Sequence, residues 1–413
     1  MLNRSIHYQE SHLYCDAVPV REIVAQTGTP VYIYSLPRVL ANFHRIQAAF
    51  PKAQIHYSAK ANANLALLHA LTRAGAGIDA VSGGEIYRAL MAHTPPEKIV
   101  FAGVGKNNFE LYYAVEQDIG WFNVENVHEA HKLNTIAGES GKTVRVALRF
   151  NPDVTANTQP QIATGHSAAK FGLTADAIRQ LLAEADKTPN VRYSGIHIHI
   201  GSQLHDSIAT TQAIRAALDL IAPYPQIRTI NIGGGLPVAY RPDETLPSVQ
   251  EFADVILPLL GDYELILEPG RSIIADAGIL ITRVLYLKEQ GGQKFVIVDA
   301  GMNDLIRPAL YDAHHEIIPV DQPDTPERQT MQIVGPICET TDTLGHNAEL
   351  PPITRGDCLA LLTAGAYGMA MASNYNARPR PPEVAISEDG SAWYLVRRRE
   401  TWHDLIEHEL DIP

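Results

Sequence analysis

The chain has 413 residues, of which 46% are apolar and 19% are charged, so it can bury a sizeable core without disulfide bonds. Its net charge of −13 argues against general binding to nucleic acids or to anionic membranes. The three cysteines, Cys15, Cys338 and Cys358, are too widely spaced for a disulfide framework or a zinc cluster. The first 20 residues contain no continuous apolar stretch of the kind that a secretory signal needs. We therefore expect a cytoplasmic protein that binds neither nucleic acid nor membrane.

The segment from residue 50 to residue 270 alternates short β-rich runs with longer stretches of helical spacing. The runs predicted as strands are Ile55–Ala59, Ile78–Val81, Ile99–Ala102, Trp121–Val124, Val144–Phe150, Tyr193–Ile200, Thr229–Ile232 and Glu264–Leu267. The stretches predicted as helices include Leu65–Arg73, Glu85–Ala92, Asn126–Ala137 and Ala175–Ala185. Eight β/α repeats in about 220 residues match the size of a TIM-type (β/α)8 barrel. An open, doubly wound parallel sheet is the alternative.

The chain after residue 270 changes to an all-β pattern. Runs of β-branched residues alternate there with turn residues, at Ile273–Val284, Phe295–Val298, Met331–Val334, Cys358–Leu362 and Ala392–Val396. We predict an α/β barrel domain over residues 31–270, and a β-sandwich or β-barrel domain built from residues 1–30 and 271–413. Whether the last segment returns to the barrel stays open. The stretch RPRPP at 378–382 predicts a rigid loop.

In a barrel of this type, catalytic groups lie at the carboxyl ends of the strands. The residues at or near the predicted strand ends include Lys60, Asp79, Ser82, Arg149, His199, Gly201, Ser202, Gly233, Gly234, Gly235, Glu268, Pro269, Gly270 and Arg271. Random placement would rarely put a lysine, a histidine, a triple glycine and an acid at four such ends. We interpret these residues as one site.

Lys60, in the sequence YSAKANAN, is the candidate nucleophile. Because burying a lysine is costly, such a residue is either ion-paired at the barrel rim or a Schiff-base lysine with a lowered pKa. The triple glycine at 233–235 lets backbone N–H groups approach a phosphate closely, although a plain turn has the same composition. Ser202 and the helix start at 83–85 could add further donors.

Glu268 ends an apolar run, so its carboxylate needs a cationic partner. That partner is Arg271, a neighbouring lysine, or the protonated pyridine nitrogen of a cofactor. His199 could stack on such a ring or be a core histidine with satisfied hydrogen bonds. Since His197 and His199 have no third ligand at a suitable spacing, we expect no metal site. Cys338, taken alone, is more typical of a small buried hydrophobe than of a catalytic thiol.

Seven motifs together carry a family resemblance. They are YSAKANAN, DAVSGGE, HIHIGSQL, NIGGGLP, EPGRSI, GPICETTD and AYGMAMASNYN. In their order and spacing, over nearly the whole chain, they resemble the diaminopimelate decarboxylases. These belong to the alanine-racemase-like, fold type III enzymes that depend on pyridoxal 5'-phosphate (PLP).

The resemblance implies a role for each residue of the predicted site. Lys60 would hold PLP covalently, His199 would stack on its ring, and Glu268 would pair with its ring nitrogen. The other residues implied at the cofactor are Asp79, Arg149, Ser202, Gly233, Gly234, Gly235, Pro269, Gly270, Arg271 and Tyr367. Cys338 would return a proton to the α carbon, and the partner subunit of a homodimer would supply it. The residues implied at the substrate are Arg271, Arg307, Tyr311, Glu339 and Tyr367.

The implied reaction converts meso-2,6-diaminopimelate to L-lysine and CO2, the last step of lysine biosynthesis. The far end of that substrate carries a carboxylate and an ammonium, which suit Arg307 and Glu339, although each could also be a solvated surface charge. A basic amino-acid or carboxynorspermidine-type decarboxylase is the closest alternative. Racemases of this fold place an arginine where Glu268 stands, and non-catalytic PLP-binding proteins lack the second domain and Cys338. Both are therefore weaker alternatives.

Overall fold

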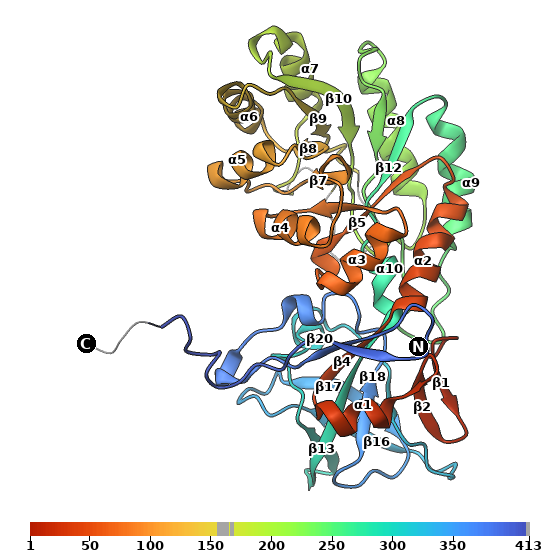
Figure 1. Ribbon diagram of the computed structural model, residues 1–413. Helices are drawn as coiled ribbons and strands as arrows, with labels where there is room; N and C mark the ends of the chain where they lie inside the picture. Colours follow the sequence, from red (N-terminus) through yellow and green to blue (C-terminus); the bar gives the residue numbers. More distant parts are fainter. Residues whose placement is uncertain (155–164, 166–168, 410–413) are drawn as a thin grey trace. The chain divides into compact units, whose positions relative to one another are not determined.

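The computed structural model describes residues 1–154, 165 and 169–409 (Figure 1). The chain divides into two compact units. The unit made of Asn42–Val238 and Thr245–Ser272 is called the barrel unit below. The unit made of Met1–Ala41, Ala239–Glu244 and Ile273–Pro413 is called the β unit. In the described part of the chain, no helix has the length and apolar composition needed to cross a bilayer.

The barrel unit is a closed ring of parallel strands, which confirms the barrel and excludes the open sheet. Its strands are β5 (Gln54–Ser58), β6 (Gly77–Ala80), β7 (Ile99–Phe101), β8 (Trp121–Val124), β9 (Val144–Arg149), β10 (Val191–His197), β11 (Thr229–Asn231) and β12 (Glu264–Leu267). The ring closes where β12 pairs with β5, with Ile266 opposite Gln54 and Leu267 opposite Ile55. Each predicted run overlaps one of these strands.

Helices follow the strands and surround the barrel (Figure 1). They are α3 (Leu65–Arg73), α4 (Gly83–Met91), α5 (Asn108–Glu116), α6 (Val127–Glu139), α7 (Ala175–Ala183), α8 (Ile208–Ile221) and α9 (Val249–Leu260). Local sequence fixes several of their starts. Asn107 and Glu110 form a reciprocal capping box at α5, and Ser82 accepts a hydrogen bond from the Glu85 backbone at the start of α4. These caps fix where α4 begins after β6 and where α5 begins after β7.

The β unit contains two sheets. The larger has β17 (Thr343–Leu350), β16 (Gln329–Val334), β14 (Gln293–Val298), β13 (Gly278–Gln290), β4 (Val31–Ser35), β19 (Glu383–Ile386) and β20 (Trp393–Arg397) in that order, with β18 (Cys358–Leu361) on β13 and β15 (Ile317–Pro319) on β18. The smaller joins β1 (Ile6–Gln9), β2 (His12–Cys15) and β3 (Val18–Pro19). Helix α1 (Val20–Thr27) belongs to this unit, α2 (Leu36–Ala49) runs from it into the barrel unit at Asn42, and a short helix, α11 (Arg307–Tyr311), follows β14.

Three elements differ most from the sequence prediction. β4, within the range that we assigned to the barrel domain, pairs with β13 and β19 of the β unit. The run Ile273–Val284 is a strand only from Gly278, because a helical turn, α10 (Arg271–Ile274), precedes it. Neither run has a hydrophobic period that reveals its strand partner or its secondary structure. β10 ends at His197, three residues before the predicted end at Ile200.

Candidate active site

A cavity of about 410 Å³ within the barrel unit brings several predicted site residues together. It is lined by Lys60, Asp79, Val81, Ala102, Gly103, Val104, Gly105, Glu110, Arg149, Phe171, His197, His199, Gly234 and Glu268. Many of these residues lie at or just beyond the carboxyl ends of the barrel strands. This is the end of a (β/α)8 barrel at which catalytic groups gather.

Lys60 lies in a 3-10 turn, η1 (Ala59–Ala61), directly after β5. Its neighbours Ala59 and Ala61 are buried, whereas Lys60 itself is exposed and lines the cavity. The premise that this lysine is buried was therefore wrong, because the turn ends the strand before Lys60 and leaves its side chain at the cavity. An amine in that position is accessible to a reactive carbonyl group.

Glu268 is buried just after β12, and three side chains from β8, β10 and β11 contact its carboxylate. Asn123 Nδ2 donates to Oε1 over 3.0 Å, Asn231 Nδ2 donates to Oε1 over 2.5 Å, and His197 Nε2 lies 3.3 Å from Oε2. Burial by itself raises the pKa of Glu268, but His197 and Asn231 outweigh it and hold the pKa below its ordinary value. The charge of Lys60 lowers the pKa further, so the carboxylate is ionised at neutral pH.

Asn123 and Asn231, which contact Glu268, were not singled out by the sequence reasoning, and His197 was considered there only as half of a metal pair with His199. Each lies at or one residue before the end of its strand, and Asn231 even stands inside the motif NIGGGLP. The signal was thus the same strand-end position that identified Glu268. It was overlooked because amides do not stand out in a single sequence, and their convergence depends on the closed barrel.

Asp79 shows the opposite behaviour to Glu268. It is buried in β6 and accepts a hydrogen bond from Ser58 Oγ over 2.5 Å. Burial, followed by repulsion from Glu268, raises the pKa of Asp79 to about 7, although Lys60 and Ser58 partly offset both effects. Two carboxyl groups lining one cavity therefore differ in protonation near neutral pH.

His199 is half-buried on the cavity wall, next to the triple glycine. Burial, and then the positive charges of Lys60 and Arg149, lower the pKa of His199 well below its ordinary value, so its ring is neutral at pH 7. Gly233 has a φ of +66°, and a Cβ atom there would lie 2.5 Å from His199 Nδ1. The glycine is therefore required both by the backbone conformation and by the close approach of the imidazole.

Most of the residues predicted at a phosphate lie in the barrel unit, whereas Tyr367 belongs to the β unit. Ser202 Oγ accepts from Arg271 Nε over 3.3 Å and from Nη2 over 3.4 Å, which links the loop after β10 to α10. Gly235 has a φ of +100°, and the Ser272 hydroxyl is buried without a hydrogen bond to the described residues. The helix start at 83–85 is a weaker source of donors, since Gly83 N bonds to Glu110 and Glu85 N to Ser82.

Arg149, at the end of β9, is held by two groups. Its Nη1 donates to the buried carboxylate of Glu125, and its guanidinium carbon lies 4.5 Å from the centroid of the Phe171 ring. Glu125 also accepts from Gly172 N over 2.9 Å. These contacts fix the guanidinium at the cavity wall.

The remaining predicted residues belong to the β unit. Arg307 is buried at the start of α11, Tyr311 is half-buried at its end, and Tyr367 is half-buried with a φ of +57°. Cys338 is exposed, so its interpretation as a buried hydrophobe is wrong. Glu339, also exposed, accepts hydrogen bonds from Thr341 Oγ1 over 3.1 Å and from the Tyr375 hydroxyl.

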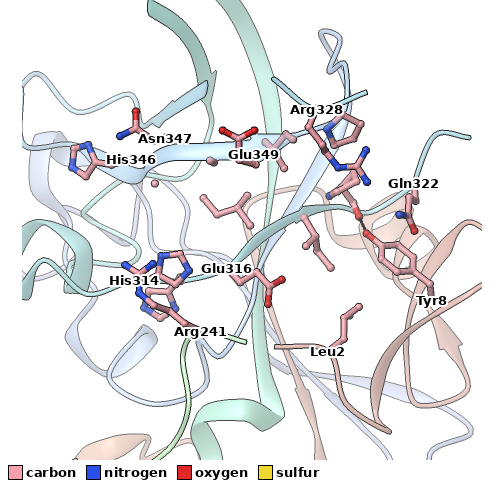
Figure 2. A pocket seen from close by; sticks show the side chains of 18 residues that line it. Leu2, Tyr8, Arg241, His314, Glu316, Gln322, Arg328, His346, Asn347 and Glu349 are labelled. Atoms are coloured by element: carbon pink, nitrogen blue, oxygen red, sulfur yellow. Dashed lines mark hydrogen bonds between the residues drawn. The ribbon is translucent and has the colours of Figure 1, made fainter. Parts of the chain in front are cut away.

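The β unit has a second cavity, of about 520 Å³, which Figure 2 shows. Arg241 and His314 lie on one side of it, Arg328 and Tyr8 on another, and Glu316 between them (Figure 2). It contains none of the predicted site residues. Among the described residues of the whole chain, no three His, Cys, Asp or Glu side chains converge as a metal site.

Comparisons with known proteins place this architecture in a family. The model of the pyridoxal-dependent decarboxylase, pyridoxal binding domain, matches residues 36–275. The chain therefore belongs to the pyridoxal-dependent decarboxylases, and PLP is its cofactor.

Two similar proteins carry the name diaminopimelate decarboxylase. A diaminopimelate decarboxylase of Aquifex aeolicus is 46% identical over 99% of this chain and 98% of its own length. The crystal structure of the diaminopimelate decarboxylase of Methanocaldococcus jannaschii in complex with L-lysine has a TM-score of 0.93 at 37% identity, over 100% of this chain and 98% of that one. A lysine/ornithine decarboxylase from Vibrio vulnificus, at 22% identity and a TM-score of 0.79, shares the fold.

The barrel cavity fits PLP in its donor set. It has an accessible amine at Lys60, an ionised acid at Glu268 for a protonated ring nitrogen, and a neutral imidazole at His199. The hydroxyl of Ser272 is buried without a hydrogen-bond partner among the described residues, in the segment that follows Gly270 and Arg271. An orphaned hydroxyl beside glycine backbone is consistent with a phosphate near the start of α10.

Proposed function

We propose that the chain removes one carboxyl group of meso-2,6-diaminopimelate as CO2 and leaves L-lysine, as a cytoplasmic enzyme of lysine biosynthesis. The observation that carries the proposal is the accessible amine of Lys60 in the same cavity as an ionised, triply contacted Glu268. The relatives named diaminopimelate decarboxylase, which match over nearly their whole length, support this substrate.

When bound, PLP supplies an electron sink that stabilises negative charge at the α carbon. The chain's own residues prepare for this. Lys60 provides the amine that holds the cofactor, and Glu268 keeps a fixed negative charge for the ring nitrogen, which Asn123, Asn231 and His197 maintain. An acid at this position favours decarboxylation over racemisation, since an arginine would not keep the ring nitrogen protonated.

The phosphate would be held by backbone and hydroxyl groups at one end of the barrel. The proposed contacts are Ser202, Gly233, Gly234, Gly235, Pro269, Gly270, Arg271 and Tyr367. Asp79 and Arg149 would contact the cofactor while Ser58 holds Asp79 and Glu125 holds Arg149 in place. Ser202 is already aligned by Arg271, so both can present N–H or O–H groups without a large rearrangement.

Cys338 would supply the proton that completes the reaction. The bond between the α carbon and the carboxyl group breaks, CO2 leaves, and the remaining electron pair accepts a proton from the thiol. The exposed position of Cys338 supports this role because the thiol is open to a ligand or to a second subunit. We propose that the partner subunit of a homodimer presents it.

The distal end of the substrate would meet Arg307 and Glu339, with Arg271, Tyr311 and Tyr367 as further contacts. A guanidinium suits the second carboxylate because it can donate two parallel hydrogen bonds, and Glu339 suits the second ammonium. Arg307 is buried, so it is not a solvated surface charge. A decarboxylase of lysine or ornithine would have no use for this buried cation.

The experiment is a substrate panel. Purified PLP-loaded protein is incubated with meso-diaminopimelate, L-lysine, L-ornithine and carboxynorspermidine, and released CO2 and the amine product are quantified. We expect stoichiometric CO2 and L-lysine from diaminopimelate, with much slower turnover of the others. Preferred release of CO2 from one of the other compounds would replace the proposed substrate.

A further inference from the structure

Arg307 is held by two side chains that lie outside every predicted site. His315 Nε2 lies 2.8 Å from Arg307 Nη1, and the centroid of the Tyr240 ring lies 4.5 Å from the guanidinium carbon. Arg307, His315 and Tyr240 are 6%, 2% and 7% exposed, so the cluster is almost dry. All three residues belong to the β unit.

The hydrogen bonds of His315 determine which of its nitrogens carries the proton. Nδ1 lies 2.9 Å from the carbonyl oxygen of Leu362, which can only accept, so Nδ1 carries the hydrogen. Nε2 is then left with a lone pair that accepts from Arg307. Burial, and then the charge of Arg307, lower the pKa of His315 well below its ordinary value, so the ring remains neutral. The backbone thus presets the acceptor that orients the guanidinium.

Tyr240 completes the arrangement. Its ring meets His315 edge-on, with centroids 5.6 Å apart and planes at 86°, and it lies against the guanidinium. One partner therefore holds an edge of the guanidinium and the other its face.

We propose that His315 and Tyr240 are positioning residues for Arg307, and that they set the enzyme's preference for ligands with a carboxylate at the distal end. This inference rests on the proposed function, because it assigns the distal carboxylate to Arg307. The two residues act through Arg307 and do not touch the reacting atoms. They convert a flexible arginine side chain into a fixed binding group, which lowers the entropy lost when a ligand binds.

The surroundings of His315 indicate what its removal would do. His315 also lines the 520 Å³ cavity, which Arg241 and His314 border (Figure 2). A smaller or apolar side chain at position 315 would expose the guanidinium to water from this cavity, where it could adopt other rotamers. The expected damage is a loss of orientation rather than of the fold.

Two matched ligands isolate the effect. L-Lysine and cadaverine carry the same two ammonium groups on the same carbon chain, but only L-lysine has a carboxylate to pair with Arg307. Inhibition constants of both are measured against diaminopimelate, with PLP-loaded wild type, His315→Phe, His315→Gln, Tyr240→Leu and Tyr240→Phe. His315→Gln retains an acceptor oxygen near the Nε2 position, and Tyr240→Phe retains the aromatic face.

We expect His315→Phe and Tyr240→Leu to raise the inhibition constant of L-lysine by about tenfold, which is the effect of one lost hydrogen bond to a charged group. The inhibition constant of cadaverine should rise by less than about twofold. His315→Gln and Tyr240→Phe should stay close to wild type for both ligands. If His315→Phe or Tyr240→Leu raised both inhibition constants equally, the role would be merely structural and the inference would be overturned. Wild-type inhibition constants for both ligands in both variants would overturn it as well. If His315→Phe does not fold, the Tyr240→Leu and Tyr240→Phe pair decides by the same criterion.

The outcome is separable from that of the proposed function. If the wild type does not decarboxylate diaminopimelate, the proposed function fails at the substrate panel, before any variant is compared. If it does, and the two ligands respond alike in the variants, only the positioning role fails.

Discussion

Two carboxyl groups in the barrel cavity have pKa values displaced in opposite directions. Both are buried, so desolvation acts on both in the same sense. Glu268 has amide donors from Asn123 and Asn231 and a nearby imidazole, whereas Asp79 has one serine hydroxyl and faces the charge of Glu268. The donors around each carboxyl therefore decide its charge, and Glu268 is the group that remains ionised for a cationic ring nitrogen.

Asp79 gives a pH-dependent prediction for the cofactor-free protein. Its folded pKa of about 7 lies above the unfolded value of about 3.9, so folding favours the protonated form. Asp79 therefore opposes folding progressively as the pH rises from about 4 to 7, and fully above that range. Asp79→Asn should raise the free energy of unfolding by about 2–4 kcal/mol at pH 8.5 and have almost no effect at pH 4.

Urea unfolding at the two pH values measures this difference. Asp262→Asn, at an exposed aspartate of the same unit, is the control and should show no such pH dependence. A stabilisation by Asp79→Asn that is equal at both pH values would mean that the ionisation of Asp79 is not its cause.

Arg307 gives the second prediction at this scale. Arg307→Ala should lower kcat/KM for diaminopimelate. The expected loss of transition-state stabilisation is about 2–5 kcal/mol, because the distal carboxylate would be left in a desolvated pocket without its partner. Arg328→Ala, at an exposed arginine of the same unit, should leave kcat/KM unchanged. An Arg307→Ala enzyme that retains the wild-type preference for diaminopimelate over L-lysine would remove Arg307 from substrate recognition.

At the scale of elements, the strand ends carry the chemistry and the glycines after β11 shape it. Gly233→Ala should weaken PLP binding by at least tenfold, because the added Cβ would meet His199 Nδ1 and the φ of +66° disfavours any side chain. Gly141→Ala is a matched control, since Gly141 also has a φ of +66° but has nothing within 4 Å of the added Cβ. Fluorescence titration of cofactor-free protein with PLP gives both dissociation constants. Equal weakening in the two variants would trace the effect to backbone strain alone.

The same elements show what a sequence can predict. The alternation of β-rich and helical runs revealed all eight barrel strands, because each β/α repeat carries its own local signal. β4 was misassigned because its five residues are buried on both faces and its partners, β13 and β19, lie hundreds of residues away. Asn123 and Asn231 were missed, and the contact of His197 with Glu268 was not foreseen, for a related reason: the three residues come from three strands and meet only when the barrel closes.

At the scale of the whole molecule, the account predicts that active sites are shared between subunits. If the partner subunit supplies Cys338, mixing Lys60→Ala with Cys338→Ala protein under conditions that allow exchange should restore part of the activity. Each mixed dimer would have one intact site and one doubly inactive site. Activity is followed by CO2 release, and exchange is verified by native mass spectrometry of differently tagged subunits. No recovery after demonstrated exchange would mean that one chain builds the site.

The central claim is that Lys60 holds PLP in the barrel cavity, and chemical trapping tests it most directly. Borohydride reduction of the purified protein, followed by proteolysis and mass spectrometry, identifies the lysine that carries the pyridoxyl group. We predict loss of the yellow colour and a single pyridoxyl adduct on the peptide that contains Lys60, with none in Lys60→Ala. An adduct on Lys52, Lys98 or Lys170 in place of Lys60 would contradict the account.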